Sequence, residues 1–395
     1  MSIFDNVKSL FFGKSKSEII NKRGVSLNTI FPDANTFDSD TALTLTAVWN
    51  AIRLLSESVS QLPCSVYKQQ DDGDKIEDKN NPIYYLLKYK PNNYQDKISF
   101  LEYIMMCICV DGNSYVQIVR DDAGRPVQLI PINPDSVTVI INEGELFYQV
   151  DTSGVLDSAD VLHFKTITDD GITGISPIDQ CAKALNWALS LEKFGATFFN
   201  NGAKPSSVLS TDRALSETAI ERLRNSFNST YSKLANSNAT IILEEGLTFK
   251  PISISPEQAQ FLASRKFSIE EVCRIWNIPP HMLGDLSKSS FSNIEMQSQE
   301  FVTYTLMPYI TRIEAQMNQK LFRSNEIGNT FIEFNVNGLL RGDVKTRNEA
   351  YKTAIQNGYM SVNEVRRKEN LNGIDGGDKH FMQLNMTTLE KIGTD

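Results

Sequence analysis

Few residues in this sequence have both the types and the spacing of a chemical site. The run Gly13-Lys14-Ser15 resembles the end of a phosphate-binding loop, which requires another glycine five positions before Gly13. Lys8 stands there, and the sequence predicts no strand ahead of the run. We therefore expect no bound nucleotide, and an enzyme driven by nucleotide hydrolysis is disfavoured.

Metal and nucleophilic chemistry have no better support. The histidines are far apart and lack the spacing of metal ligands: His163, His281 and His380. Cys107 and Cys109 lie in an apolar run, which favours core packing over metal binding. Asp169-Asp170-Gly171 and Asp375-Gly376-Gly377-Asp378 are typical of turns, and no further carboxylate cluster accompanies them. With no Ser/His/Asp or Cys/His order either, we expect no catalytic residue, metal or cofactor.

Basic residues suggest two different contacts with nucleic acid. Arg366-Arg367-Lys368 lies on the second of two predicted C-terminal helices, as in a helix-turn-helix reader of DNA. Glu364 and Glu369 balance this charge, so a solvated helix face fits better. A DNA-binding regulator that uses this helix pair stays open as the alternative function, and it predicts salt-dependent binding by residues 336–395. Lys288 differs because it stands alone in a polar segment, where it could touch a phosphate backbone.

Composition limits the protein class. The 395 residues are 41% hydrophobic and 22% charged, as in ordinary globular proteins, and the net charge of −9 argues against a surface that coats nucleic acid. The five cysteines are an odd number in apolar surroundings, which predicts reduced thiols and folding in the cytoplasm. No apolar run approaches the roughly 18 residues of a membrane span, and the first residues lack the features of a secretory signal.

Two long helices and the polar segment between them organise the chain. Leu262, Ile269 and Trp276 belong to an apolar stripe on a helix that ends at the prolines after Asn277. Residues 285–291 have almost nothing to bury and predict an exposed loop. A second long helix follows, and Pro308 should bend it near Tyr304. A single small chain cannot bury the apolar stripes of both long helices, so another protein surface must cover them.

The other elements predict an α+β fold. A helix over residues 45–62 is followed by short strands with turns between them, which excludes an alternating doubly wound sheet. A helix from Ser176 to about residue 202 leads into a small insert, whose main helix covers residues 216–234. Two helices, over residues 343–356 and 361–370, close the chain.

An ordered set of motifs runs through most of the chain. They are Lys90-Pro91-Asn92, Gly112-Asn113-Ser114-Tyr115, Leu129-Ile130-Pro131-Ile132-Asn133-Pro134, Asp160-Val161-Leu162-His163-Phe164, Gly174-Ile175-Ser176-Pro177, Asn201-Gly202-Ala203-Lys204-Pro205-Ser206, Ile278-Pro279-Pro280-His281-Met282-Leu283-Gly284, Glu300-Phe301 with Leu306-Met307-Pro308, and Gly358-Tyr359-Met360-Ser361-Val362-Asn363-Glu364. Each motif is weak alone. Together, from about Leu45 to Leu384, the sequence resembles the portal proteins of tailed double-stranded DNA bacteriophages.

This resemblance implies a division of the chain into the parts of a portal subunit. An N-terminal arm would cover 1–40, and the wing 41–175, completed by 292–335. The stem helices would be 176–202 and 256–284, and the α/β clip 203–255. A tunnel loop would cover 285–291 and a short helical crown 336–395.

The resemblance also implies a function that involves no catalysis. A ring of usually twelve copies at one capsid vertex of the virion would pass DNA during packaging and ejection. Implied partners are double-stranded DNA, the terminase large subunit, head-tail adaptor proteins, the major capsid protein and scaffold, with no membrane. The tunnel loop would present Lys288, Ser287, Ser289 and Ser290 to DNA, and Arg222 and Arg224 of the clip would dock terminase or adaptors. Leu262, Ile269 and Trp276 would pack the stem between subunits.

Overall fold

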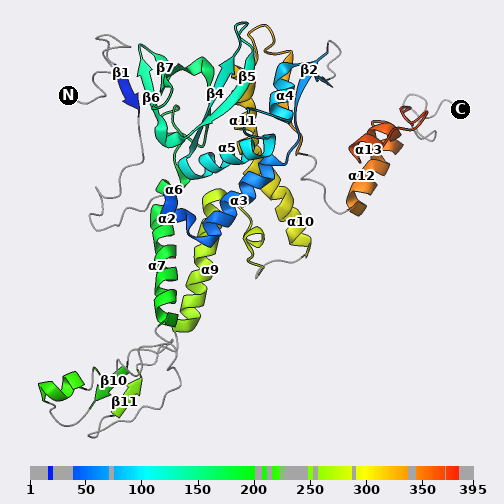
Figure 1. Cartoon of the computed structure of the whole chain (residues 1–395). Coiled ribbons are helices and arrows are strands. Elements are labelled where there is room, and N and C mark those ends of the chain that lie inside the picture. The colour runs from blue at the N-terminus through cyan, green and yellow to red at the C-terminus, as the bar shows by residue number, and fades with distance from the viewer. Residues whose placement is uncertain are drawn as a thin grey trace. The chain divides into compact units, whose positions relative to one another are not determined.

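The chain forms two compact units, Met1–Phe334 and Asn335–Asp395 (Figure 1). The computed structural model describes residues 17–20, 39–70, 75–200, 207–210, 216–222, 225, 248–251, 257–286, 291–336, 344–369 and 371–381. Within these residues, no helix combines the length and the apolar character that crossing a membrane requires.

The described residues of the first unit form four sheets. Their strands are, in order across each sheet, β5 (Pro126–Ile132), β4 (Asn113–Arg120) and β9 (Val161–Lys165); β1 (Ser17–Ile20), β6 (Val137–Asn142), β7 (Glu145–Val150) and β8 (Gly154–Asp157); β12 (Thr330–Phe334), β2 (Cys64–Gln69) and β3 (Lys75–Glu77); and β10 (Ser207–Ser210) with β11 (Thr248–Pro251). All the pairings are antiparallel. Mixed with the helices, these sheets confirm the predicted α+β class.

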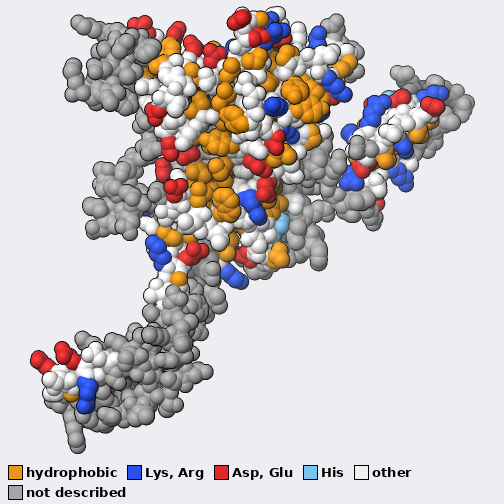
Figure 2. All heavy atoms as spheres, viewed as in Figure 1, with side chains coloured by type: hydrophobic (Ala, Val, Ile, Leu, Met, Phe, Trp, Pro, Cys, Tyr) orange, Lys and Arg blue, Asp and Glu red, His pale blue; other side chains and the backbone are white. Residues whose placement is uncertain are grey.

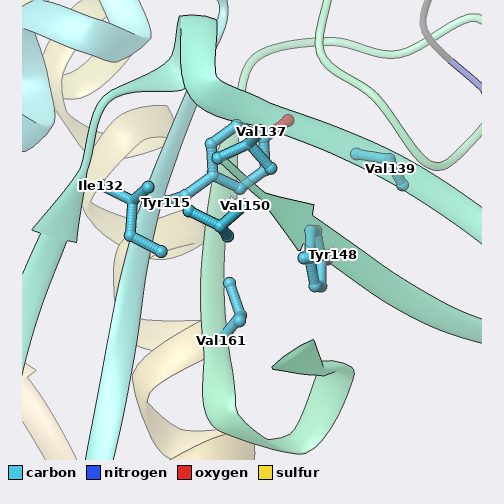
Figure 3. Close-up of a cluster of buried hydrophobic side chains, with 7 residues drawn as sticks. All are labelled: Tyr115, Ile132, Val137, Val139, Tyr148, Val150 and Val161. Carbon is cyan, nitrogen blue, oxygen red and sulfur yellow. The ribbon is translucent and has the colours of Figure 1, made fainter. Parts of the chain in front are cut away.

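A hydrophobic cluster joins two of these sheets (Figure 3). Its members come from β4, β5 and β9 on one side and from β6 and β7 on the other: Tyr115, Ile132, Val137, Val139, Tyr148, Val150 and Val161. The alternation of apolar and polar residues along each strand places these side chains on the covered face. One face of the sheet that contains β4 therefore packs against the sheet that contains β6 and β7.

Among the described residues, six helices lie between the strands of the first unit up to β9, and two of them, α3 and α5, are longer than the others. They are α2 (Ser39–Leu43), α3 (Thr46–Ser60), α4 (Pro82–Lys88), α5 (Lys97–Asp111), η2 (Pro134–Ser136) and η3 (Ser158–Asp160). Helix α5 is apolar on nearly all sides and packs against α3 and β4, so it is buried, as its sequence predicted. Asp96 accepts a hydrogen bond from the Ser99 amide at its start, and Gly112 ends it in the left-handed conformation.

The long helices follow. One predicted helix is split at Cys181 into α6 (Pro177–Gln180) and α7 (Ala182–Asn200), and α7 packs beside α9 (Glu257–Trp276) (Figure 1). After η5 (Pro280–Leu283), the second long helix comprises α10 (Phe291–Glu300), a π-helix η6 (Phe301–Leu306) and α11 (Met307–Lys320). The irregular π-helix lies where a bend near Tyr304 was predicted. Helix α11 contacts β9 and β12.

The second unit consists of two described helices and a loop. Helices α12 (Val344–Gln356) and α13 (Val362–Lys368) match the predicted pair, and Ser361 and Glu364 form a capping box at the start of α13. Asn363 holds the following loop, because its side chain exchanges two hydrogen bonds with the backbone of Ile374. This unit is therefore ordered around a buried polar side chain.

The sequence did not predict three features of the sheets. Strand β1, from the N-terminal arm, pairs with β6, and β8 pairs with β7. Strand β11 pairs with β10; a hairpin of residues 241–243 with 247–254, which the sequence also predicts, involves residues outside the described part of the chain. The β1–β6 and β10–β11 pairings join segments far apart in the chain, which local sequence patterns do not encode, whereas β7 and β8 form a hairpin whose second strand was not predicted.

Candidate functional site

The connection from the sheets to α6 and α7 is a close contact between two glycines, here called the glycine junction (Gly112 and Gly174). A Cβ atom added to Gly174 would lie 2.0 Å from the Gly112 carbonyl oxygen. The Thr166 amide donates to the same oxygen at 2.9 Å, and the Thr166 hydroxyl donates to the Ile175 carbonyl at 2.7 Å. The Ser176 hydroxyl, which caps α6, donates to the Val110 carbonyl at 2.7 Å. The junction thus fixes where α6 starts relative to α5.

A buried polar network supports the glycine junction. The Asn113 side chain donates to the Gly174 carbonyl at 2.8 Å and accepts from the Gly174 amide at 2.7 Å, which fixes its orientation. Its oxygen lies 2.9 Å from His163 Nε2, so Nε2 carries the proton. His163 Nδ1 then accepts from the Tyr148 hydroxyl at 3.1 Å. His163 also stacks on Tyr115, so the histidine links the hydrophobic cluster to the junction.

Burial determines the protonation of this histidine. His163 is 3% exposed, and its burial, assisted by the positive charges of Lys165 and Lys320, lowers its pKa from 6.5 to about 3. The imidazole is therefore neutral at neutral pH and is a structural group. Asn113, His163 and Gly174 belong to three separate sequence motifs, and the fold joins them in one network. Asn113 and Gly174 are 61 residues apart in the chain.

Helices α7 and α9 expose aromatic side chains, here called the aromatic ridge (Trp187, Phe194 and Phe267). Trp187 is 45% exposed, Phe194 58% and Phe267 45%. The rings of Trp187 and Phe267 meet edge to face with centroids 6.0 Å apart, and the Arg274 guanidinium lies 5.4 Å from the centre of the Phe267 ring. In the part of the chain that the structure describes, these three rings stay about half exposed.

The predicted role of Trp276 in packing between subunits is wrong. Trp276 is only 2% exposed within the single chain, and its indole N–H donates to the Cys109 carbonyl of α5 at 3.3 Å. Ile269 is half-buried, and Leu262 lies on α9 but its side chain is outside the described residues. Val272, Cys273 and Trp276 are buried at the C-terminal end of the stripe, where α9 contacts α3 and, through Trp276, α5 of the same chain. The spacing of Trp187 and Phe194, seven residues apart, was the signal for the ridge that the sequence reading missed.

Other apolar side chains are also exposed to solvent in the single chain. Figure 2 shows hydrophobic side chains gathered over the part of the first unit where α3, α4 and α5 lie. Three exposed tyrosines belong to α4 and the segment after it: Tyr85, Tyr89 and Tyr94. The rings of Tyr85 and Tyr89 lie 5.7 Å apart. Exposed aromatic clusters of this kind are typical of protein contact surfaces.

The end of α9 is tied to the π-helix, in what we call the α9–π joint (Asn277, Tyr304 and Thr305). Asn277 has a left-handed backbone with φ of 54°, and Ile278 N–H donates to the Cys273 carbonyl at 2.8 Å, as in a Schellman cap. The buried Thr305 hydroxyl donates to the Asn277 carbonyl. The side-chain amide nitrogen of Asn277 lies 3.4 Å from the Tyr304 carbonyl oxygen. Asn277 and the π-helix, which are the two ends of the intervening segment, therefore meet at the α9–π joint.

Most predicted DNA and docking residues are not described. Lys288 and its neighbours Ser287, Ser289 and Ser290 lie outside the described residues, as does Arg224. Arg222 is exposed at the end of a short helical segment that begins at residue 217. The structure therefore does not test the predicted DNA contacts, and it places only Arg222 of the predicted docking pair.

The C-terminal basic residues have local partners. Arg367 pairs with Asp378 at 2.8 Å, and Arg366 donates to the Asn372 carbonyl at 2.7 Å. These contacts support the solvated helix face over a DNA reader. In the described part of the chain, no group of three or more histidine, cysteine or acidic side chains is placed to hold a metal ion. The five cysteines form no disulfide, and burial raises the pKa of Cys64 and Cys107 to about 12.

Comparison with known proteins gives concordant matches. The family model described as "Phage portal protein" matches residues 46–370. The portal protein of Enterobacteria phage HK97 is 32% identical over 369 residues, which cover 91% of this chain and 86% of that protein. The probable portal protein of Streptomyces phage phiC31 is 30% identical, covering 91% of this chain and 82% of the relative.

Solved structures share the fold. A crystal structure of an HK97-family phage portal protein from Corynebacterium diphtheriae has a TM-score of 0.56 at 19% identity, covering 76% of this chain and 97% of that one. The neck of an empty gene transfer agent particle has a TM-score of 0.61 at 20% identity, covering 94% and 99% of the two chains.

Proposed function

The chain belongs to the phage portal protein family and functions as a portal protein, and we propose that its copies form a ring around a DNA channel. The observation that carries this proposal is the family match over residues 46–370, which spans both compact units. The acidic net charge of −9 per chain is consistent with a channel that DNA passes without adhering, because like charges repel.

The aromatic ridge supports the ring as its oligomeric form. Trp187, Phe194 and Phe267 lie on α7 and α9 and stay about half exposed among the described residues. In a closed ring each copy presents one face to its neighbour's other face, so every ridge would be covered. We assign the stem contact to this ridge, in place of Trp276.

Replacement of Trp187 by glutamate tests the ring. A charge buried in the contact would be desolvated without a partner, so we expect at least about a tenfold loss of assembled species at a fixed protein concentration. The Trp187→Phe variant keeps an apolar ring at the same place and should assemble as the unmodified chain does. Native mass spectrometry and electron microscopy of the purified proteins measure both. Equal assembly of the glutamate variant would place the subunit contact elsewhere.

The remaining parts of the function follow the proposed division of the chain. We propose that residues 41–175 with 292–335 form the wing, 176–202 and 256–284 the stem, 203–255 the clip and 336–395 the crown. The observed contacts of α11 with β9 and β12 support the completion of the wing. The clip, with Arg222 exposed, is the proposed docking surface for terminase and adaptors. The ring would occupy one capsid vertex of the virion and would not act as an enzyme.

Lys288 is the proposed DNA contact of the channel. The Lys288→Glu variant reverses a positive charge in a predicted polar loop, so we expect it to reduce DNA packaging or retention while the ring still assembles. The measurement is DNase-protected DNA per particle, with ring mass as the control. A normal amount of protected DNA in the variant would exclude Lys288 as a channel contact.

A further inference from the structure

Strand β1 lies at the edge of its sheet, beside β6 (Figure 1). It is the outermost strand in the order β1, β6, β7 and β8. Strands β6, β7 and β8 follow one another in the chain and pair without any contribution from β1. The described members of the hydrophobic cluster come from β4, β5, β6, β7 and β9. The meander of β6, β7 and β8 is therefore complete without β1.

The pairing of β1 with β6 has a defined register. Four successive residues pair antiparallel, so that Ile19 stands opposite Ile140 and Ile20 opposite Val139. Val139 and Ile140 are buried, at 2% and 3% exposure. A shift by one residue would set the charged Glu18 opposite Ile140, which is unfavourable at a buried position. The β6 edge therefore accepts a strand of this pattern, in which two isoleucines follow a charged residue.

Charge distinguishes β1 from other strands that could pair with this edge. A strand edge that lacks its neighbour presents unpaired amides and carbonyls, to which a strand of the same or another chain can add. In the sequence, Lys16 precedes β1, and Lys22 and Arg23 follow it. Acidic residues stand at the two ends of β6, Asp135 before it and Glu143 after it. These opposite charges favour β1 over a second copy of β6 as the partner of the edge.

The length of the arm lets β1 reach beyond its own chain. Residues 21–38 join β1 to α2, and these 18 residues can span up to about 60 Å when extended. A compact chain of the size of the first unit is roughly 50 Å across. The β6 edge of an adjacent copy in a ring would therefore lie within reach. Strand β1 makes the same backbone hydrogen bonds on either copy, so exchange between copies loses no contact.

We propose that β1 of each copy adds to the β6 edge of a neighbouring copy in the ring, so that the arms link the subunits by strand exchange. The family model begins at residue 46, so the arm precedes the part of the chain that the family shares. Exchanged strands would join adjacent copies at their sheets, in addition to the contact assigned to the aromatic ridge. This inference rests on the proposed ring.

Paired cysteines show which copy receives β1. Ser17 and Asn142 are directly opposite in the register, at a Cα separation that suits a disulfide. With oxidised glutathione, the variant with Ser17→Cys and Asn142→Cys should lose its monomer band and form a ladder of dimers and higher multimers on a denaturing, non-reducing gel. Ser17→Cys with Ser153→Cys is the matched control and should stay monomeric, because Ser153 precedes β8 at the far edge of the sheet.

Mixed rings test the exchange with one new thiol in each chain. Chains that carry only Ser17→Cys, co-expressed with chains that carry only Asn142→Cys, should give cross-linked dimers and no higher multimers. Each single variant alone should give monomers, which also reports any reaction with the five cysteines of the chain itself.

Two results would overturn the exchange. A monomer band in the double variant with both new thiols consumed would mean that each arm pairs with its own β6. New thiols that stay unreacted would mean that β1 and β6 do not pair in the ring. Native mass spectrometry of the unmodified chain measures the ring separately. The absence of rings there would contradict the proposed function, whereas rings that show only monomer bands would contradict the exchange alone.

Discussion

Replacement of Gly174 by alanine is expected to destabilise the chain by about 4 kcal/mol or more, enough to abolish a stable fold in most domains. The added Cβ would lie 2.0 Å from the Gly112 carbonyl oxygen and 2.9 Å from the Thr166 nitrogen. Both are backbone atoms, so no side-chain rotation relieves the clash. Moving the segments around Gly112 and Gly174 apart would break the Thr166–Gly112 hydrogen bond and both hydrogen bonds between Asn113 and Gly174.

Gly171→Ala is the matched control for this prediction. Gly171 has a positive φ of 77°, yet nothing lies within 4 Å of an added Cβ. Its replacement costs only the backbone strain of a left-handed alanine, about 1–2 kcal/mol. The yield of soluble protein and the midpoint of urea unfolding measure both variants. If Gly174→Ala unfolds at the same urea concentration as Gly171→Ala, the close approach of the two glycines does not determine stability.

The sequence predicted local elements better than their partners. Helix α3, strand β2 and the capping box of α13 follow from apolar spacing, β-branched residues and a cap signature, all of which are local. Strand β1 could not be predicted, because four residues in a charged and polar arm carry too little pattern, and their pairing with β6 is a tertiary choice.

The same limit explains the error at Trp276. Helical spacing placed Trp276 on one stripe with Ile269, and it could not show which neighbour covers each end of that stripe. The fold brings α3 and α5 against the C-terminal turns of α9, so that end is already covered. A proline signal likewise located the irregularity near Tyr304, but it could not show that the Asn277 side chain, 27 residues away in the chain, approaches the Tyr304 carbonyl.

Acid is expected to destabilise the first unit through His163. The pKa of this buried histidine is lowered from 6.5 to about 3, so between these values the unfolded chain binds a proton that the folded chain does not. The stabilisation is fully present above pH 6.5 and is lost as the pH falls toward 3, by about 1.4 kcal/mol per pH unit. Protonation would put a second donor against the Tyr148 hydroxyl and a charge near Lys165 and Lys320.

His163→Gln separates this effect from the titration of carboxylates. Glutamine can donate to Asn113 but does not titrate, so the variant should be less stable than the unmodified chain at pH 7.5 and should lose less stability on acidification. Between pH 6 and 4.5 the difference between the two unfolding free energies should shrink by about 2 kcal/mol, measured by urea unfolding at each pH. Parallel pH dependences would mean that His163 takes up its proton equally in both states. The neutral imidazole would then not be required to connect the hydrophobic cluster to the glycine junction.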